Sequence, residues 1–188
     1  PPAGIAVIRI SGEQASAALV TLAGKVPPPR RASRAWLKAA DGSLLDDGLV
    51  LFFPGPATAT GEDLAELHLH GGRAVVSAVE AELAGLPGLR KAQPGEFTRR
   101  AFANGRIDLA EAEGLADLLS AETELQRRAA ISNAGGFLSR KAEEWRTDLL
   151  RLSAQVEAAL DFADEDDVGA IPTAFMANLA FLASDIDG

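Results

Sequence analysis

Three polar side chains alternate with apolar ones in residues 64–70, which predicts a strand with Glu66, His68 and His70 on one face. Two histidines beside a carboxylate are potential metal ligands, but only two His occur in the chain and a fourth ligand is not evident. Alternatively, the Glu66 carboxylate could accept from the ring N–H and amine of a 2-amino-4-oxo heterocycle such as a pterin or guanine. The ordinary interpretation is a polar strand face, with Glu66 solvated or paired with an arginine.

Arg9 interrupts an otherwise apolar strand expected at residues 4–10. A guanidinium in such a strand is costly unless it meets an anion or a carboxylate. Taken alone, Arg9 is explained as well by an ion pair within the fold as by a ligand contact.

A group of five basic residues lies between positions 90 and 106 and consists of Arg90, Lys91, Arg99, Arg100 and Arg106. Its side chains could contact phosphate or a ligand carboxylate, or they could form a solvated face. No phosphate-binding loop of the form G-x-x-x-x-G-K-[ST] occurs in the 188 residues, and Gly71-Gly72 is interpreted as a plain turn. With no cysteine and no assignable Ser–His–Asp arrangement, we expect neither a catalytic residue nor a metal ligand in this chain.

The elements that must position these residues fall into two halves of different composition. The chain has 188 residues, 47% of them apolar, and a net charge of −9. Residues 1–107 carry a net charge of +2 and residues 108–188 a net charge of −11, which predicts two units with different roles. The acidic half lacks the basic excess that nucleic-acid binding requires. No apolar run approaches the roughly 18 residues of a membrane helix, and the chain is expected to start inside a longer protein.

The first half is expected to be an α+β domain with a mixed sheet or partial barrel. Its expected strands are residues 4–10, 36–40, 44–53, 64–70 and 89–92, and its expected helices end near Ala23, Gly85 and Asn104. Ser11 and Gln14 have the spacing of a capping box for the first helix, and Asp41-Gly42 favours a hairpin turn. Two short-stranded sheets in so few residues would leave exposed edges, which favours self-association with two-fold symmetry.

The second half is expected to be an incomplete all-α domain. Asp108 and Glu111 form a capping box that opens a helix to about Ser120. A long helix from about 122 to 162 follows, weakened at Gly135-Gly136, and Pro172 suits the first position of a third helix ending near Ser184. The apolar seam of the long helix needs a facing surface, which further chain or a second copy should supply.

Four segments occur in order along the chain: GIAVIRISG, FPGPATATGEDLAELHLHGG, PGEFTRRAFANGRIDLAEAEGLADLL and VEAALDFADED. Together they closely resemble the family of the tRNA-modification GTPase MnmE, also called TrmE. The resemblance covers nearly all of residues 1–170 and fits residues 172–188 only loosely. The chain departs from the family at residues 1–4, where the family often has an Arg-containing glycine-rich stretch, so no contact of that Arg is carried over.

The resemblance implies that residues 1–107 are a tetrahydrofolate-binding and dimerisation domain and that residues 108–188 are the opening helices of a helical domain. It places the folate, 5-formyl- or 5,10-methylenetetrahydrofolate, against Arg9, Glu66 and Arg106, the last standing where the family often has Lys. The family also pairs folate with a C-terminal Lys that this chain lacks.

For the whole protein, the resemblance implies a cytoplasmic GTPase that uses GTP, Mg²⁺ and K⁺ in an inserted G domain. With the flavoprotein MnmG (GidA), it modifies C5 of the wobble uridine of certain tRNAs. The G domain is absent from these residues, so the chain alone is not expected to hydrolyse GTP. Two alternatives remain open: an independent folate-dependent one-carbon transferase, and a dimerisation scaffold without a ligand.

Overall fold

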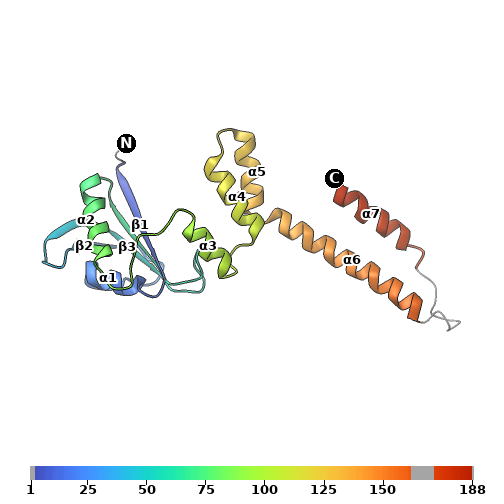
Figure 1. Ribbon diagram of the computed structural model, residues 1–188, viewed down its shortest axis with the longest axis horizontal. Coiled ribbons are helices and arrows are strands. Elements are labelled where there is room, and N and C mark those ends of the chain that lie inside the picture. Colours follow the sequence, from blue (N-terminus) through green and yellow to red (C-terminus); the bar gives the residue numbers. More distant parts are fainter. Residues whose placement is uncertain (1–2, 162–171, 188) are drawn as a thin grey trace. The chain divides into compact units, whose positions relative to one another are not determined.

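The computed structural model describes residues 3–161 and 172–187, and the chain divides into two compact units, residues 1–107 and 108–188. The first unit contains β1 (Ile5–Ser11), α1 (Ala15–Ala23), β2 (Ser33–Lys38), β3 (Leu44–Phe53), β4 (Leu64–His70), α2 (Arg73–Ala84) and α3 (Glu96–Ala103). The second contains α4 (Leu109–Ser120), α5 (Glu124–Ala134), α6 (Phe137–Asp161) and α7 (Phe175–Asp187) (Figure 1). The α+β class of the first unit and the helical character of the second are confirmed.

The strands of the first unit form one four-stranded sheet in the order β1-β4-β3-β2. Each neighbouring pair is antiparallel, so within the described residues the mixed sheet and the two separate sheets of the prediction are wrong. The reason lies in the connections: β2 and β3 form the expected hairpin, β4 returns beside β3, and β1 pairs with the free side of β4.

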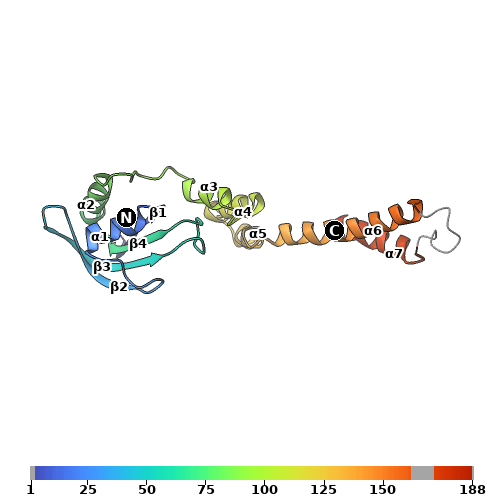
Figure 2. The same ribbon diagram turned by 90° about the horizontal axis from the view of Figure 1, so that it is seen from below.

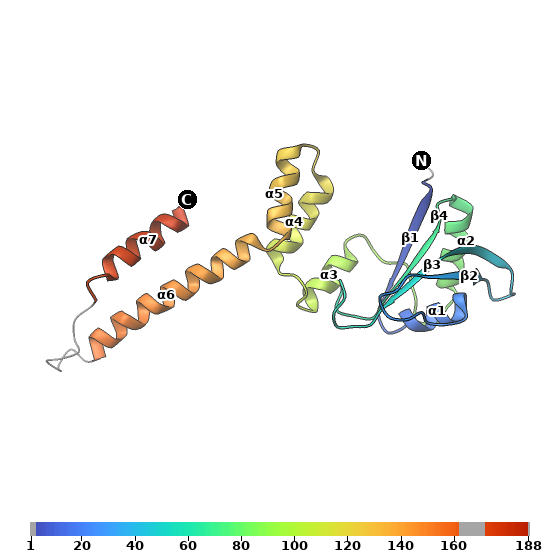
Figure 3. The same cartoon turned by 180° about the vertical axis from the view of Figure 1, so that it is seen from behind.

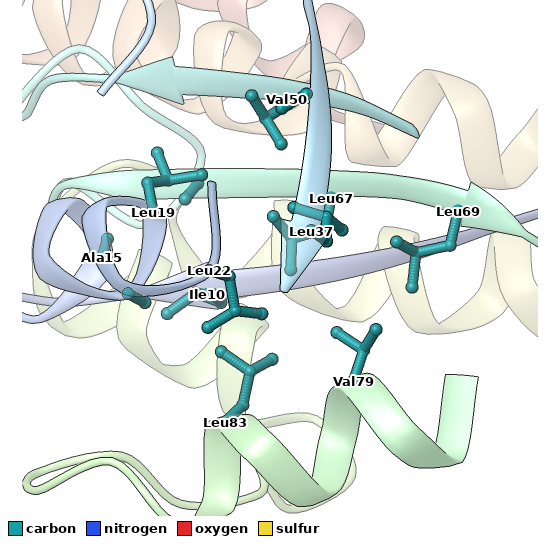
Figure 4. Close-up of a cluster of buried hydrophobic side chains, with 13 residues drawn as sticks. Ile10, Ala15, Leu19, Leu22, Leu37, Val50, Leu67, Leu69, Val79 and Leu83 are labelled. Atoms are coloured by element: carbon teal, nitrogen blue, oxygen red, sulfur yellow. The ribbon is translucent and has the colours of Figure 1, made fainter. Parts of the chain in front are cut away.

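The alternation predicted for residues 64–70 is confirmed in β4. Ala65, Leu67 and Leu69 are buried in the core, whereas Glu66 and His68 lie on the opposite face of the sheet. α1 and α2 both lie on the core face of the sheet (Figure 2), and the buried side chains gather between these helices and the sheet (Figure 4). The core consists of Ile10, Ala15, Ala18, Leu19, Leu22, Ala35, Leu37, Val50, Ala65, Leu67, Leu69, Val79 and Leu83.

The opposite face of the sheet, called here the open face, carries both charged and apolar side chains. Its side chains include Ile5, Val7, Arg9, Arg34, Trp36, Asp47, Leu49, Leu51, Phe53, Glu66 and His68. Ile5, Val7, Trp36 and Leu49 are exposed there. An apolar sheet face of this kind is usually covered by another element or another chain.

Two local predictions for the first unit are wrong. Helix α1 begins at Ala15 with Gln14 as its N-cap, because Ser11 pairs with Leu64 as the last residue of β1 instead of capping the helix. Residues 89–92 do not form a strand, since this segment has no neighbouring strand and the side chain of Arg90 is bonded to Glu96.

Helices α4 and α5 of the second unit pack closely against each other. The predicted capping box of α4 is present, with Asp108 accepting from the backbone of Glu111 and Glu111 accepting from the backbone of Asp108. Gly114 lies at the contact with α5, where a Cβ atom would be 2.4 Å from the backbone nitrogen of Ala134. The close approach of the two helices therefore depends on the missing side chain at residue 114.

The long helix expected at 122–162 is two helices, α5 and α6, and the prediction of a single helix is wrong. Gly136 has a φ of 70°, a left-handed conformation that cannot continue an α-helix. The end of the expected helix at 162, like the last five residues of the fourth family-like segment, lies outside the described residues.

Helix α7 packs against α6 within the second unit (Figure 3). The Trp145 Nε1–H donates to Asp185 Oδ2 at 2.7 Å, and Lys141 Nζ lies 3.3 Å from the same oxygen. Helix α7 begins at Phe175 and not at Pro172, whose carbonyl accepts from the Phe175 backbone N–H.

Candidate functional site

Arg9 and Glu66 face each other across β1 and β4. They are register partners in the antiparallel pair, and the Arg9 Nε–H donates to Glu66 Oε1 at 2.9 Å. Side chains of directly opposed residues lie on the same face, so both point to the open face. The Glu66 side chain is only 15% exposed and that of Arg9 is 58% exposed. The structure thus brings together two of the three residues assigned to the folate.

The second oxygen of Glu66 contacts His68, whose Nε2 lies 3.0 Å from Oε2. Burial opposes ionisation of Glu66, but the hydrogen bonds from His68 and Arg9 outweigh it, and the pKa of Glu66 lies below its ordinary value. Glu66 is therefore an ionised acceptor at neutral pH, held in place from two sides.

Arg106, the third assigned residue, lies beside the loop that precedes β4. Its Nε–H donates to the carbonyl of Thr58 at 3.1 Å, and a Cβ atom at Gly61 would lie 3.3 Å from the Arg106 stem. Among the described residues no hydrogen bond or ion pair joins Arg106 to Arg9 or Glu66. The structure places Arg106 beside the loop, Glu66 on β4, which follows the loop, and Arg9 on β1.

His70 does not join Glu66 and His68. Its ring Nδ1 lies 2.7 Å from Asp46 Oδ1, and its backbone N–H donates to Asp46 Oδ2 at 2.8 Å. Because Asp46 holds His70 away, the three side chains considered as metal ligands are not gathered. In residues 3–161 and 172–187, no three His, Cys, Asp or Glu side chains are placed to hold a metal ion.

Most of the basic group is neutralised by carboxylates. Arg90 forms a two-fold contact with Glu96, Arg100 bridges Glu96 and Glu62, and Lys91 pairs with Glu80. The interpretation of this group as a phosphate-binding patch is therefore not supported for these three side chains. Glu96 is almost fully buried, and hydrogen bonds from Arg90, the Gln93 backbone and Arg100 hold its pKa far below the ordinary value.

A polar network in the loop before β4 was not predicted from the sequence. The Ser11 hydroxyl contacts Thr60 Oγ1 at 2.6 Å and donates to Glu62 Oε2 at 2.9 Å, while the Asn104 amide donates to the Thr60 carbonyl at 2.7 Å. Thr58 and Thr60 are both buried. Burial of threonines in a loop has no periodic signal, although the Gly/Pro/Thr-rich composition marked the loop itself.

One surface pocket of the first unit, of about 160 Å³, lies between α1 and residues 86–89. Its lining includes Gln14, Thr21, Leu86 and Leu89 but none of the three assigned residues. Arg9 and Glu66 lie on the open face instead.

Comparisons with known proteins agree with this division of the chain. Residues 1–106 match the family model described as GTP-binding protein TrmE N-terminus, and residues 109–187 match the MnmE helical domain. The chain is 73% identical over 171 residues to the tRNA modification GTPase MnmE of Novosphingobium aromaticivorans, covering 90% of this chain and 39% of that protein. It is 61% identical over 186 residues to the same-named protein of Erythrobacter litoralis, covering 99% of this chain and 44% of the relative.

These matches define an N-terminal TrmE-type domain followed by a helical domain. The chain belongs to the MnmE (TrmE) family of tRNA modification GTPases, which confirms the resemblance. It spans about two fifths of the length of the curated relatives it matches.

Proposed function

We propose that the first unit binds a tetrahydrofolate one-carbon donor, 5-formyl- or 5,10-methylenetetrahydrofolate, on its open face, with Glu66 holding the pterin ring. The observation that carries the proposal is the ionised, largely buried Glu66 carboxylate, fixed by Arg9 and His68 on an otherwise accessible sheet face. The folate would supply the one-carbon unit.

The donor set of the site fits this ligand. A carboxylate has about four acceptor positions on its two oxygens, and Arg9 and His68 occupy one on each. The remaining positions can accept from the ring N–H and the exocyclic amine of a pterin, which form a parallel pair of donors. Such charge-assisted pairs are stronger than neutral hydrogen bonds.

The two arginines complete the proposed site. Arg9 keeps free donors for a ligand carbonyl, and Arg106 presents its remaining guanidinium N–H groups beside the loop at Thr58. An arginine in place of the lysine that the family often has keeps the charge but adds a planar fork, which favours two-fold contact with a carboxylate.

For the whole protein we propose the activity in the names of its relatives, a tRNA modification GTPase. The chain would act in the cytoplasm with the flavoprotein MnmG on C5 of the wobble uridine of certain tRNAs. GTP, Mg²⁺ and K⁺ would bind in a G domain, because these 188 residues contain no phosphate-binding loop. None of the described helices has the length and apolarity that a membrane crossing demands.

We also propose that the first unit forms a homodimer. The exposed side chains of Ile5, Val7, Trp36 and Leu49 share the open face, and β1 and β2 are edge strands. A second copy would cover apolar surface that no helix of this unit is seen to cover.

Glu66→Ala tests the folate assignment. Removing a largely buried, specific charged partner should cost about 2–5 kcal/mol of binding free energy, more than substitution of Arg9 or Arg106. The measurement is calorimetric titration with 5-formyltetrahydrofolate, with folding checked by circular dichroism.

Glu80→Ala is the matched control, because Glu80 is a more exposed carboxylate that pairs with Lys91 in the same unit. If a folded Glu66→Ala variant binds as well as the parent, the pterin assignment is wrong and Glu66 is only the structural partner of Arg9.

A further inference from the structure

Arg30 has an unusual backbone conformation for its side chain. It lies between α1 and β2 with a φ of 59°, in the left-handed region that glycine and asparagine adopt more readily. Its backbone N–H donates to the carbonyl of Phe52 at 2.8 Å, which fixes it beside the end of β3. A glycine could make the same backbone contact, so the backbone alone does not account for an arginine at this position.

The Arg30 guanidinium lies on the same face of the sheet as Glu66. It stacks 5.7 Å from the centroid of the Phe53 ring, and its Nη2 donates to the carbonyl of Ala57. Phe53 pairs with Leu64, two residues before Glu66 on β4. Phe53 and Glu66 are therefore diagonal neighbours on the open face, at the usual Cα spacing of about 7–8 Å.

Arg30 and Arg106 donate hydrogen bonds to the carbonyls of two consecutive residues in the loop before β4. Arg30 contacts the carbonyl of Ala57, and Arg106 contacts that of Thr58. Within the described residues neither side chain has a carboxylate partner, in contrast to Arg9, which pairs with Glu66. Two guanidinium groups thus bind neighbouring residues of the loop before β4, and each keeps donors that its carbonyl contact does not use.

We propose that Arg30 is a further ligand-binding residue and that, with Arg106, it binds the carboxylates of the glutamate tail of the folate. This inference rests on the proposed function of the same site. A folate carries a heterocycle at one end and a glutamate with two carboxylates at the other. Glu66 matches the first end, and the guanidinium groups of Arg30 and Arg106 at the loop before β4, beyond Phe53, match the second.

The experiment compares two ligands, 5-formyltetrahydrofolate and 5-formyltetrahydropteroate, which lacks the glutamate. Each is titrated by calorimetry against the 188-residue chain and its Arg30→Gly variant. Glycine accepts the left-handed backbone, so the loop is kept while the guanidinium is lost. We expect Arg30→Gly to weaken binding of the folate by about tenfold or more, the loss typical of one charged hydrogen bond. Binding of the pteroate should be unchanged.

The matched control is Arg31→Gly, because Arg31 is the exposed neighbouring arginine. Arg30→Lys should recover part of the folate affinity, since it restores the charge without the planar fork. Equal weakening of both ligands by Arg30→Gly, or no weakening of either, would overturn the assignment of Arg30 alone. A parent chain that binds neither ligand would overturn the folate proposal and this inference with it.

Discussion

Glu96 illustrates at the residue scale how a buried carboxylate can serve the fold alone. It accepts hydrogen bonds from Arg90, from Arg100 and from the Gln93 backbone, so its acceptor positions are largely used within the chain. Glu66 differs because its two partners leave acceptor positions free on a sheet face that a ligand can reach. The Glu66 carboxylate differs from that of Glu96, which serves only structural ion pairs, because Glu66 still has acceptor positions available for a ligand.

The depressed pKa of Glu96 has a consequence for acid stability. The unfolded chain binds a proton at Glu96 more readily than the folded chain does, so stability that is present at neutral pH declines as the pH falls below the ordinary value of 4.5. A glutamine at position 96 does not ionise, so the Glu96→Gln variant lacks this pH-dependent contribution to the free energy of unfolding. We expect it to be less stable than the parent at pH 7, with a difference in melting temperature that narrows between pH 5 and pH 3.

Thermal unfolding at several pH values measures this difference. Glu80→Gln serves as the control, because the ion pair of Glu80 with Lys91 is exposed to solvent and should contribute little. A melting-temperature difference between parent and Glu96→Gln that stays constant from pH 7 to pH 3 would contradict the role given to Glu96.

At the scale of elements, the contact between α4 and α5 depends on Gly114. Alanine is the better helix former by about 1 kcal/mol, yet its Cβ here would lie 2.4 Å from the Ala134 nitrogen and 2.8 Å from the Asn133 carbonyl carbon. Because these are backbone atoms, the helices must separate. We expect Gly114→Ala to destabilise the second unit by about 1–3 kcal/mol, as overpacking usually does.

Urea unfolding followed by helical circular dichroism tests Gly114→Ala. Gly4→Ala is a suitable control, since a Cβ there meets no atom within 4 Å. If Gly114→Ala instead stabilised the helices, the close packing of α4 against α5 would be contradicted.

Elements with their own local signals could be predicted from the sequence. The alternation of β4, the hairpin of β2 and β3 and the capping box at Asp108 each depend on neighbours in the sequence. The start of α1 could not be predicted, because Ser11 is recruited by a strand and a loop about fifty residues away. The break at Gly136 was marked only as a weak point, since the sequence does not show which glycine takes the left-handed conformation.

The candidate site was predictable in its residue types but only partly in its geometry. Arg9 was singled out as a charge in an apolar strand and Glu66 as a carboxylate on the polar face of an alternating strand, and the structure makes them cross-strand partners. The contact of Arg106 with Thr58 spans 48 residues and depends on how α3 ends, which no local pattern encodes. Arg30 carries no motif, and only its backbone conformation and its place over Phe53 distinguish it.

At the scale of the whole molecule, the open face predicts self-association. Val7 lies on that face, whereas Val20 is exposed on α1, which packs on the other face. We expect the parent chain to form a two-fold dimer at micromolar concentration and Val7→Lys to shift it toward monomer, because a charge would be buried without a partner.

Sedimentation velocity of the 188-residue chain distinguishes the outcomes. Val20→Lys is the control, because it makes the same substitution at an exposed valine away from the open face. A parent that stays monomeric at high micromolar concentration, or a Val7→Lys variant that associates as well as Val20→Lys, would contradict dimerisation through the open face.

The strand order β1-β4-β3-β2 also determines when the sheet can form during synthesis. β4 pairs with both β1 and β3, yet it is the last of the four strands to leave the ribosome. Until β4 emerges, β1 has no neighbouring strand, and Arg9 has no ion-pair partner, because Glu66 lies 57 residues further along the chain. Pairings of such long sequence separation form slowly, and an unpaired apolar strand invites association with other chains. We therefore expect the nascent first unit to pass through a stage in which β1 is unpaired, and this stage ends only when residues 64–70 have left the ribosome.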